Sequence, residues 1–195
     1  MVIFWGIVFD AQDVAHVYAI VPLSARPETV FAVLTDYARW PSLFGRSCVE
    51  YATALHELGE PYSKAIAILR LSTLYGLGDP RFVATLGGMC FMSNNFTEAQ
   101  SVFSEAIKRQ FPAIEAQRIQ FRPRDPQNLT QRLRVPGRVV TVKPGYVLIE
   151  HPGYPRFLCP GSRYSGLPMR HGLELTFEPA FSARGALANR PAVAQ

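Results

Sequence analysis

The chain has 195 residues, of which 48% are hydrophobic and 18% are charged, and its net charge is +5. This composition excludes a largely disordered chain and allows one large domain or two small ones. The apolar opening segment, residues 1–9, lacks a basic leader and is shorter than the roughly 20 apolar residues that cross a membrane. We therefore expect buried structure there, with no export signal and no membrane association.

The charge is divided unevenly along the chain. Residues 1–113 contain eight Lys and Arg against ten Asp and Glu, for a net charge of −2. Residues 114–195 contain twelve against five, for a net charge of +7. Clustered Lys and Arg attract phosphates, so this asymmetry favours an anionic partner for the C-terminal part. Surface charge that serves only solubility is the alternative.

Three segments of the N-terminal part share one spacing of side chains: 26–37, 61–72 and 95–106. In each, a compact apolar residue is followed four positions later by a large one, as in Ala99 and Phe103. This offset lies on one helical face. The segments recur after 35 and 34 residues, which is the period of helix-turn-helix arrays. Helical patterns at 47–58 and 81–92 precede the second and third segments. The sequence predicts α-helical hairpin repeats over residues 1–113.

The third repeat resembles the tetratricopeptide repeat family. Its matching residues are Leu86, Gly87, Phe96, Ala99, Phe103, Ala106 and Pro112. The resemblance implies closely packed helix pairs whose concave face docks a protein or peptide. A role as a spacer is the alternative. Residues 27–41 are also similar to the first helix of START-like lipid-pocket domains, but those domains continue with strands, whereas helical periodicity follows here.

Residues 114–135 combine prolines with five arginines, which breaks the helical periodicity. We predict a basic linker there, with a short helix or strand near its start. Beyond it, short β patterns separated by Gly and Pro occur at 137–143, 146–150, 156–159, 173–178 and 186–190. Five short strands predict a small five-stranded β-barrel over residues 136–190, followed by a tail at 191–195.

The order of these strands resembles the cold-shock domain, an OB-fold. The first strand opens with Gly137, and the second begins with Gly145 and Tyr146. Leu148 and Cys159 stand where the family has an aromatic residue and a histidine. The resemblance implies that exposed aromatic residues stack on unpaired bases while Lys and Arg hold phosphates. The implied nucleic-acid-binding residues are Arg138, Lys143, Tyr146, Leu148, Tyr154, Arg156, Phe157, Arg163, Phe181 and Arg184. A packing role for any of these aromatic side chains is the alternative.

No pattern in the chain predicts catalysis. The four histidines lack the spacing of metal ligands, and no glycine-rich phosphate loop or serine nucleophile motif is present. The three cysteines are odd in number and far apart, which suits a reducing cytoplasm. We expect no catalytic residues, metal site or cofactor. The sequence predicts a cytoplasmic adaptor that binds single-stranded RNA or DNA and docks a protein, with a protein-interaction scaffold as the alternative.

Overall fold

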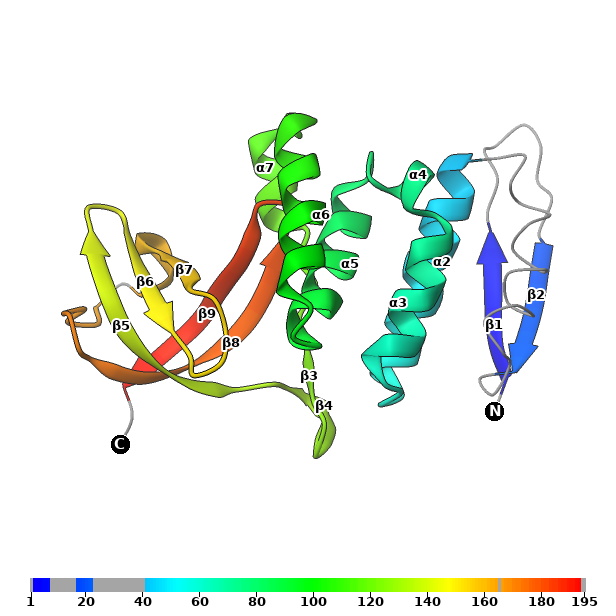
Figure 1. Ribbon diagram of the computed structural model, residues 1–195. Helices are drawn as coiled ribbons and strands as arrows, with labels where there is room; N and C mark the ends of the chain where they lie inside the picture. The colour runs from blue at the N-terminus through cyan, green and yellow to red at the C-terminus, as the bar shows by residue number, and fades with distance from the viewer. Residues whose placement is uncertain (1, 8–16, 23–40, 165, 194–195) are drawn as a thin grey trace.

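The computed structural model describes residues 2–7, 17–22, 41–164 and 166–193 (Figure 1). Strand β1, Val2–Ile7, pairs antiparallel with β2, Val17–Pro22. Part of the region predicted as helical repeats is therefore a pair of antiparallel strands, and the first helix among the described residues begins at Pro41. The first predicted repeat lies outside the described residues, as does the START-like segment apart from its last residue.

Both of the other predicted helical hairpins are present. The first joins α2, Pro41–Glu57, to α3, Tyr62–Leu71, and the second joins α5, Pro80–Met92, to α6, Phe96–Lys108. The short helix α4, Thr73–Gly76, connects them. Within the described residues, no helix is both long and apolar enough to cross a membrane.

Local side chains fix where the second hairpin's helices begin. The Asp79 carboxylate accepts a hydrogen bond of 2.7 Å from the Arg81 amide, and Pro80 occupies the first turn, where its missing N–H costs nothing. The Asn95 side chain likewise accepts from the Glu98 amide at 3.4 Å. These capping residues satisfy amides that no helical carbonyl reaches.

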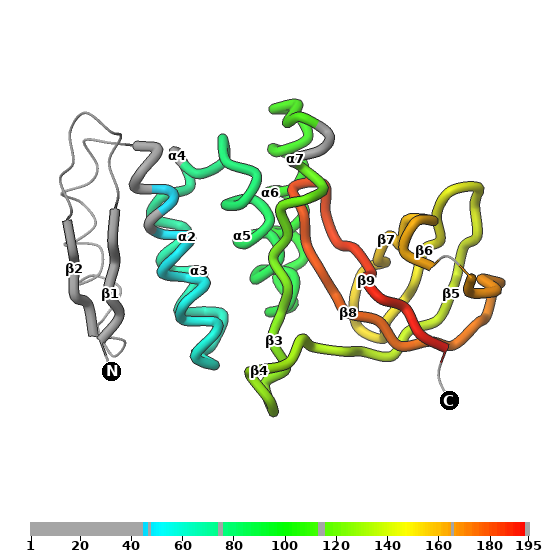
Figure 2. Tube along the Cα trace, turned by 180° about the vertical axis from the view of Figure 1, so that it is seen from behind, coloured from blue at the N-terminus to red at the C-terminus, as the bar shows by residue number. Residues whose placement is uncertain are grey.

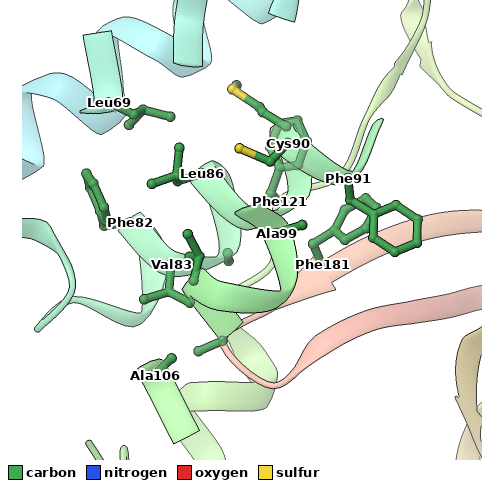
Figure 3. Close-up of a cluster of buried hydrophobic side chains, with 14 of the residues drawn as sticks. Leu69, Phe82, Val83, Leu86, Cys90, Phe91, Ala99, Ala106, Phe121 and Phe181 are labelled. Carbon is green, nitrogen blue, oxygen red and sulfur yellow. The ribbon is translucent and has the colours of Figure 1, made fainter. Parts of the chain in front are cut away.

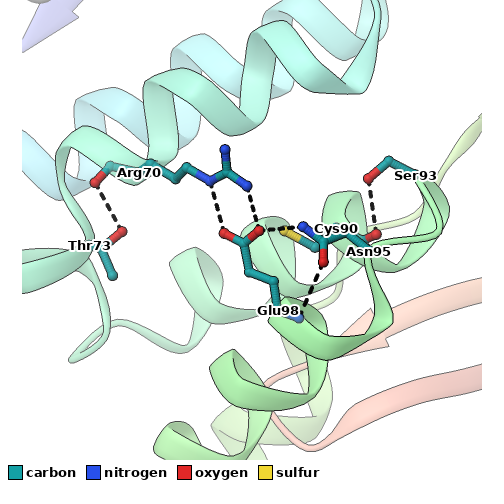
Figure 4. Close-up of polar contacts among 6 residues, drawn as sticks. All are labelled: Arg70, Thr73, Cys90, Ser93, Asn95 and Glu98. Atoms are coloured by element: carbon teal, nitrogen blue, oxygen red, sulfur yellow. Dashed lines mark hydrogen bonds and ion pairs between the residues drawn. The ribbon is translucent and has the colours of Figure 1, made fainter.

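The two hairpins are joined by an ion pair and by close packing. Arg70 of α3 donates from Nε to Oε1 of Glu98 on α6 at 2.9 Å, and its Nη2 binds the other oxygen of the same carboxylate (Figure 4). Within the second hairpin, Gly87 faces Phe103: a Cβ at Gly87 would come within 2.5 Å of the ring. Glycine thus lets the two helices approach closely, and Ala99 and Ala106 are buried in the same helix pair.

Five C-terminal strands form one closed sheet. They are β5 (Val135–Lys143), β6 (Tyr146–Glu150), β7 (Phe157–Pro160), β8 (Glu174–Ser182) and β9 (Gly185–Val193). The order is β5-β6-β7-β9-β8, with β8 pairing back to β5, and the β7–β9 contact is the parallel one. All five lie where the sequence predicts strands. Strand β9 extends to Val193, so most of the predicted tail belongs to the sheet.

The segment predicted as a linker is folded against both neighbours. It contains α7 (Ala113–Arg118), β3 (Arg124–Asp125) and β4 (Asn128–Arg132), and the last two form a hairpin. Between α7 and β3, Phe121 is buried and exchanges two backbone hydrogen bonds of 2.8 Å with Phe181 of β8. Figure 2 shows this stretch running between the helical hairpins and the barrel.

Helices and barrel share one hydrophobic core. Figure 3 shows Phe91 of α5 beside Phe121 and Phe181. The Phe91 ring centroid lies 5.1 Å from that of Phe181 and 5.3 Å from that of Phe157. On the same helix, a Cβ at Gly88 would lie 2.6 Å from Phe121 and 2.8 Å from Phe181. The two parts that the sequence predicts as separate domains are therefore packed against each other through these side chains.

Candidate nucleic-acid interface

The outer face of β5, β6 and β7 carries two rows of side chains. Cross-strand pairing aligns Lys143, Tyr146 and Pro160 in one row. The next outward row aligns Thr141, Leu148 and Leu158. Residues that pair directly across neighbouring strands point to the same face of the sheet. Because side chains alternate along each strand, every second pair lies on the outer face.

Burial separates this face from the barrel interior. Tyr146 and Leu158 are each 36% exposed, and Leu148 is half-buried. The following row, which aligns Ile149 with Phe157, is fully buried. An exposed tyrosine beside two leucines therefore forms an apolar patch on the outside of a closed barrel.

Cations lie at the edges of this patch. Lys143 is exposed at the end of β5, where Pro144 and Gly145 make the turn into β6. Gly145 has a φ of 84°, which fits the third position of a type II turn with proline before it. Arg138 and Arg156 are exposed toward the opposite ends of β5 and β7, and Arg138 approaches Glu174 only at 3.9 Å. Of the predicted residues, Arg138, Lys143, Tyr146 and Leu148 thus lie on β5 and β6, and Arg156 lies directly before β7.

Two predicted stacking residues are core residues instead. Phe157 is 1% exposed and Phe181 is fully buried. The Phe157 ring lies 4.9 Å from the Phe177 ring, in an edge-to-face arrangement. Neither ring presents a face to solvent, so in this structure neither is available to stack on bases. The reason is register: a shift of one residue along a strand moves a side chain to the other face.

Tyr154 also packs inward. It lies in the loop between β6 and β7, and its ring is stacked on Phe91 at 5.7 Å and meets Phe96 edge-on at the same distance. His151, in the same loop, bonds through Nδ1 to the Pro136 carbonyl at 2.7 Å and packs against Tyr154. Tyr154, half-buried, thus joins this loop to the helices, and its role in base contact stays a prediction.

The remaining two predicted cations lie outside the patch. Arg184 is exposed in the turn between β8 and β9, and its amide bonds to the Ser182 hydroxyl at 3.2 Å. Arg163 is half-buried in the 3-10 turn η2, Gly161–Arg163, which directly follows β7. Its Nη1 is buried and has no hydrogen-bond partner. Burial lowers the pKa of Arg163 from its ordinary value, and the charge of Arg122 lowers it further.

The sequence missed Leu158, Thr141 and Pro160 on the outer face. Strand β7 reads Phe-Leu-Cys-Pro, so polarity gives no sign of which residues point inward. The neighbouring strand does give a sign, because Glu150 and Tyr146 on β6 alternate with the buried Val147 and Ile149. Pairing of β6 with β7 then determines which side of β7 is exposed.

A separate cavity of about 450 Å³ lies where the first helical hairpin, the β3–β4 hairpin and the barrel meet, and it is lined by His56, Tyr62, Arg124, Leu129, Tyr154 and Phe157, among others. His56 is 7% exposed and stacks on Tyr62 at 5.2 Å. Its Nε2 accepts a hydrogen bond of 2.9 Å from the Arg124 amide. Burial lowers the pKa of His56 to about 4. The ring is therefore neutral at pH 7, and its accepting nitrogen is already occupied.

The three thiols are buried and unpaired with one another. Burial raises the pKa of Cys48 and of Cys159 to about 11 and that of Cys90 to about 12. Thiols held in the protonated form are poor nucleophiles and poor metal ligands. Within the described residues, no three His, Cys, Asp or Glu side chains gather as metal ligands would.

Comparisons with protein-family models, with curated proteins and with solved structures found no match to this chain. The outer face of β5, β6 and β7 therefore has to be interpreted from its own side chains. These combine one exposed aromatic ring, two aliphatic neighbours and cations at the edges, a set that offers stacking and phosphate contacts.

Proposed function

We propose that the protein is a non-enzymatic adaptor that binds single-stranded RNA or DNA on the outer face of β5, β6 and β7. The observation that carries the proposal is the exposed patch of Tyr146, Leu148 and Leu158, edged by Lys143 and Arg156. In proteins that bind single strands, bases stack on such a platform while cations contact the backbone.

The strand order supports the proposal. An order of first, second, third, fifth and fourth strand, closed by pairing of the fourth with the first, is that of OB-fold barrels, to which the cold-shock domain belongs. OB-folds bind oligonucleotides on the face of their second and third strands, which correspond here to β6 and β7. The apolar patch lies on these two strands.

The chemistry of the patch also limits how it binds. Tyr146 is the one aromatic ring that the described residues place on this face, so we expect one stacked base, worth about 1–3 kcal/mol. Stacking and backbone contacts carry little sequence information. Binding should therefore be modest in affinity, tolerant of sequence and strongly dependent on salt.

The helical hairpins are the proposed docking surface for a protein or peptide. Two features of the second hairpin support the tetratricopeptide-like part of the proposal. Gly87 packs against Phe103, and Ala99 and Ala106 are buried between the paired helices. A cytoplasmic location belongs to the same proposal, since the buried free thiols suit a reducing compartment.

Titration of the intact chain with a labelled single-stranded oligonucleotide at two salt concentrations tests the proposal. Changing Tyr146→Ala together with Leu158→Ala should weaken binding by about 5- to 150-fold, the loss expected for one stacked base. The control is Ile107→Ala, which removes a side chain that is 64% exposed on α6. If the double variant binds the oligonucleotide as tightly as the unchanged chain does, the proposed interface is refuted.

The second candidate is a protein-interaction scaffold without nucleic-acid binding. The aliphatic character of the outer face favours this scaffold function, because Leu148 and Leu158 lie next to each other in the row beside Tyr146. If the unchanged chain binds no oligonucleotide at low salt, the scaffold function replaces the nucleic-acid function.

A further inference from the structure

A second groove, lined with arginines, lies on another part of the molecule. It has a volume of about 380 Å³, and its charged lining residues are Glu50, Glu57, Arg81, Arg118, Arg122 and Arg132. These side chains come from α2, from α5, from the stretch around α7 and from β4. The groove is therefore assembled by the segment that joins the helices to the barrel.

The two carboxylates of the groove are already neutralised. Glu50 accepts from Arg81 at 3.0 Å, and Glu57 accepts from Arg124, which lies just outside the groove, also at 3.0 Å. No described carboxylate lies within ion-pair distance of Arg118, Arg122 or Arg132. Three arginines of the groove thus make no ion pair with a carboxylate whose side chain the structure describes.

The arginines hold fixed positions and repel one another. The Arg132 guanidinium donates to the Arg122 carbonyl at 2.8 Å, and the Arg122 guanidinium donates to the Gln120 side chain at 3.3 Å. The pKa of Arg132 is lowered first by burial and then by the charges of Arg124 and Arg122. The charges of Glu57 and Glu178 offset part of that shift. An anion bound between these side chains would relieve the repulsion.

Arg163 adds a further positive charge near the groove. Arg163 is close enough to Arg122 for the two charges to interact. It ends the turn that follows β7, the strand whose Leu158 lies on the outer face. Arg163 also has a buried Nη1 without a hydrogen-bond partner. Arg163 and Arg122 thus place positive charge both after β7 and in the groove.

We propose that this groove binds the phosphate groups of a single-stranded nucleic acid whose bases contact the barrel face, an inference that rests on the proposed function. Guanidinium groups suit this role because their planar N–H donors match phosphate oxygens in pairs. Lys143, Arg138 and Arg156 are the cations at the edges of the patch. The arginines of the groove would add phosphate contacts to these.

The experiment uses the intact chain, a labelled oligonucleotide and, separately, inorganic polyphosphate as a probe without bases. The test variant combines Arg122→Gln with Arg132→Gln. A second variant, Arg122→Lys with Arg132→Lys, keeps both charges but not the paired donors. The matched control, Arg109→Gln with Arg170→Gln, removes two exposed charges that do not line the groove.

Loss of two phosphate contacts should reduce the slope of log K against log salt by about 1.4 for a single strand. Between about 50 and 200 mM salt, the unchanged chain should then lose about sevenfold more affinity than the glutamine variant. We expect the lysine variant to keep the steep slope and the control variant to match the unchanged chain. A glutamine variant with the original slope and affinity, or a control variant with an equal loss, would overturn the groove as a phosphate site.

The two proposals fail in different ways. If Tyr146→Ala with Leu158→Ala weakens oligonucleotide binding as expected while the glutamine variant binds normally, the groove proposal fails and the barrel interface stands. If the unchanged chain binds polyphosphate through the groove but binds no oligonucleotide, the nucleic-acid occupant is overturned together with the proposed function.

Discussion

Lowering the pH should destabilise the fold through His56. The ring is 7% exposed, it is enclosed by Tyr62 and Phe121 at 5.2 and 5.1 Å, and its pKa is lowered to about 4. The unfolded chain has an ordinary histidine pKa of about 6.5. Below that pH the unfolded state binds a proton that the folded state rejects. Stability is therefore complete above about pH 6.5 and decreases as the pH falls toward 4.

The magnitude follows from the two pKa values. Between pH 7 and pH 5 the expected loss is about 2 kcal/mol, and it approaches about 3 kcal/mol below pH 4. Denaturant unfolding at both pH values measures it, with His56→Gln as the comparison, because glutamine keeps an acceptor for the Arg124 amide but does not titrate. Titration of other groups cancels in the difference between the two proteins. Equal pH dependence in both would refute this account of His56, as would an NMR titration of the intact chain that places its pKa near 6.5.

Two further predictions concern the packing and the charge of α5 and α6. Gly88→Ala should destabilise the chain by about 1–3 kcal/mol, because the overlap with Phe121 and Phe181 outweighs a gain of about 1 kcal/mol in helix propensity. Gly78→Ala, where a Cβ meets no atom within 4 Å, is the control and should be near neutral in denaturant unfolding. Glu98→Gln should cost on the order of 1 kcal/mol at pH 7, since Arg70 donates to the carboxylate and lowers its pKa. That cost should shrink as acid protonates the Glu98 carboxylate of the unchanged chain, because both proteins then lack the charge. A deficit that stays constant as the pH is lowered would contradict this account.

Local signals in the sequence were sufficient to locate most elements. The helical pattern at 81–92 lies within α5, and the small-to-large spacing of Ala99 and Phe103 predicts the face of α6 that packs. Glycine and proline at the β5–β6 turn fix where β6 begins, which is why its predicted bounds agree with the structure. These features depend on neighbours within a few residues along the chain.

The candidate site was predicted less well because its geometry depends on pairing between strands. Phe157, Leu158 and Cys159 are all apolar, so composition does not reveal which of them faces outward. The family resemblance aligned a phenylalanine with a stacking position, whereas the pairing of β7 with β6 puts that ring in the core. The arginine groove was missed for a related reason: Arg81 and Arg132 lie 51 positions apart and meet only in the folded chain.

The common core has a consequence for how the protein unfolds. Phe91 of α5 contacts Phe157 and Phe181 of the barrel, and Phe121 of the connecting segment completes the cluster. A barrel without the helices would expose all of these rings, and removing one buried phenylalanine alone costs about 3–5 kcal/mol.

We therefore expect α5 and β8 to unfold together, as one cooperative unit. Native-state hydrogen exchange measures this directly, because amides that open only by global unfolding share one free energy. The slowest amides of α5 and β8 should have equal opening free energies, and Phe91→Ala should lower both by the same amount. A larger decrease in α5 than in β8 would mean that the barrel retains its structure when the helices open, and that the shared aromatic cluster does not couple the two parts.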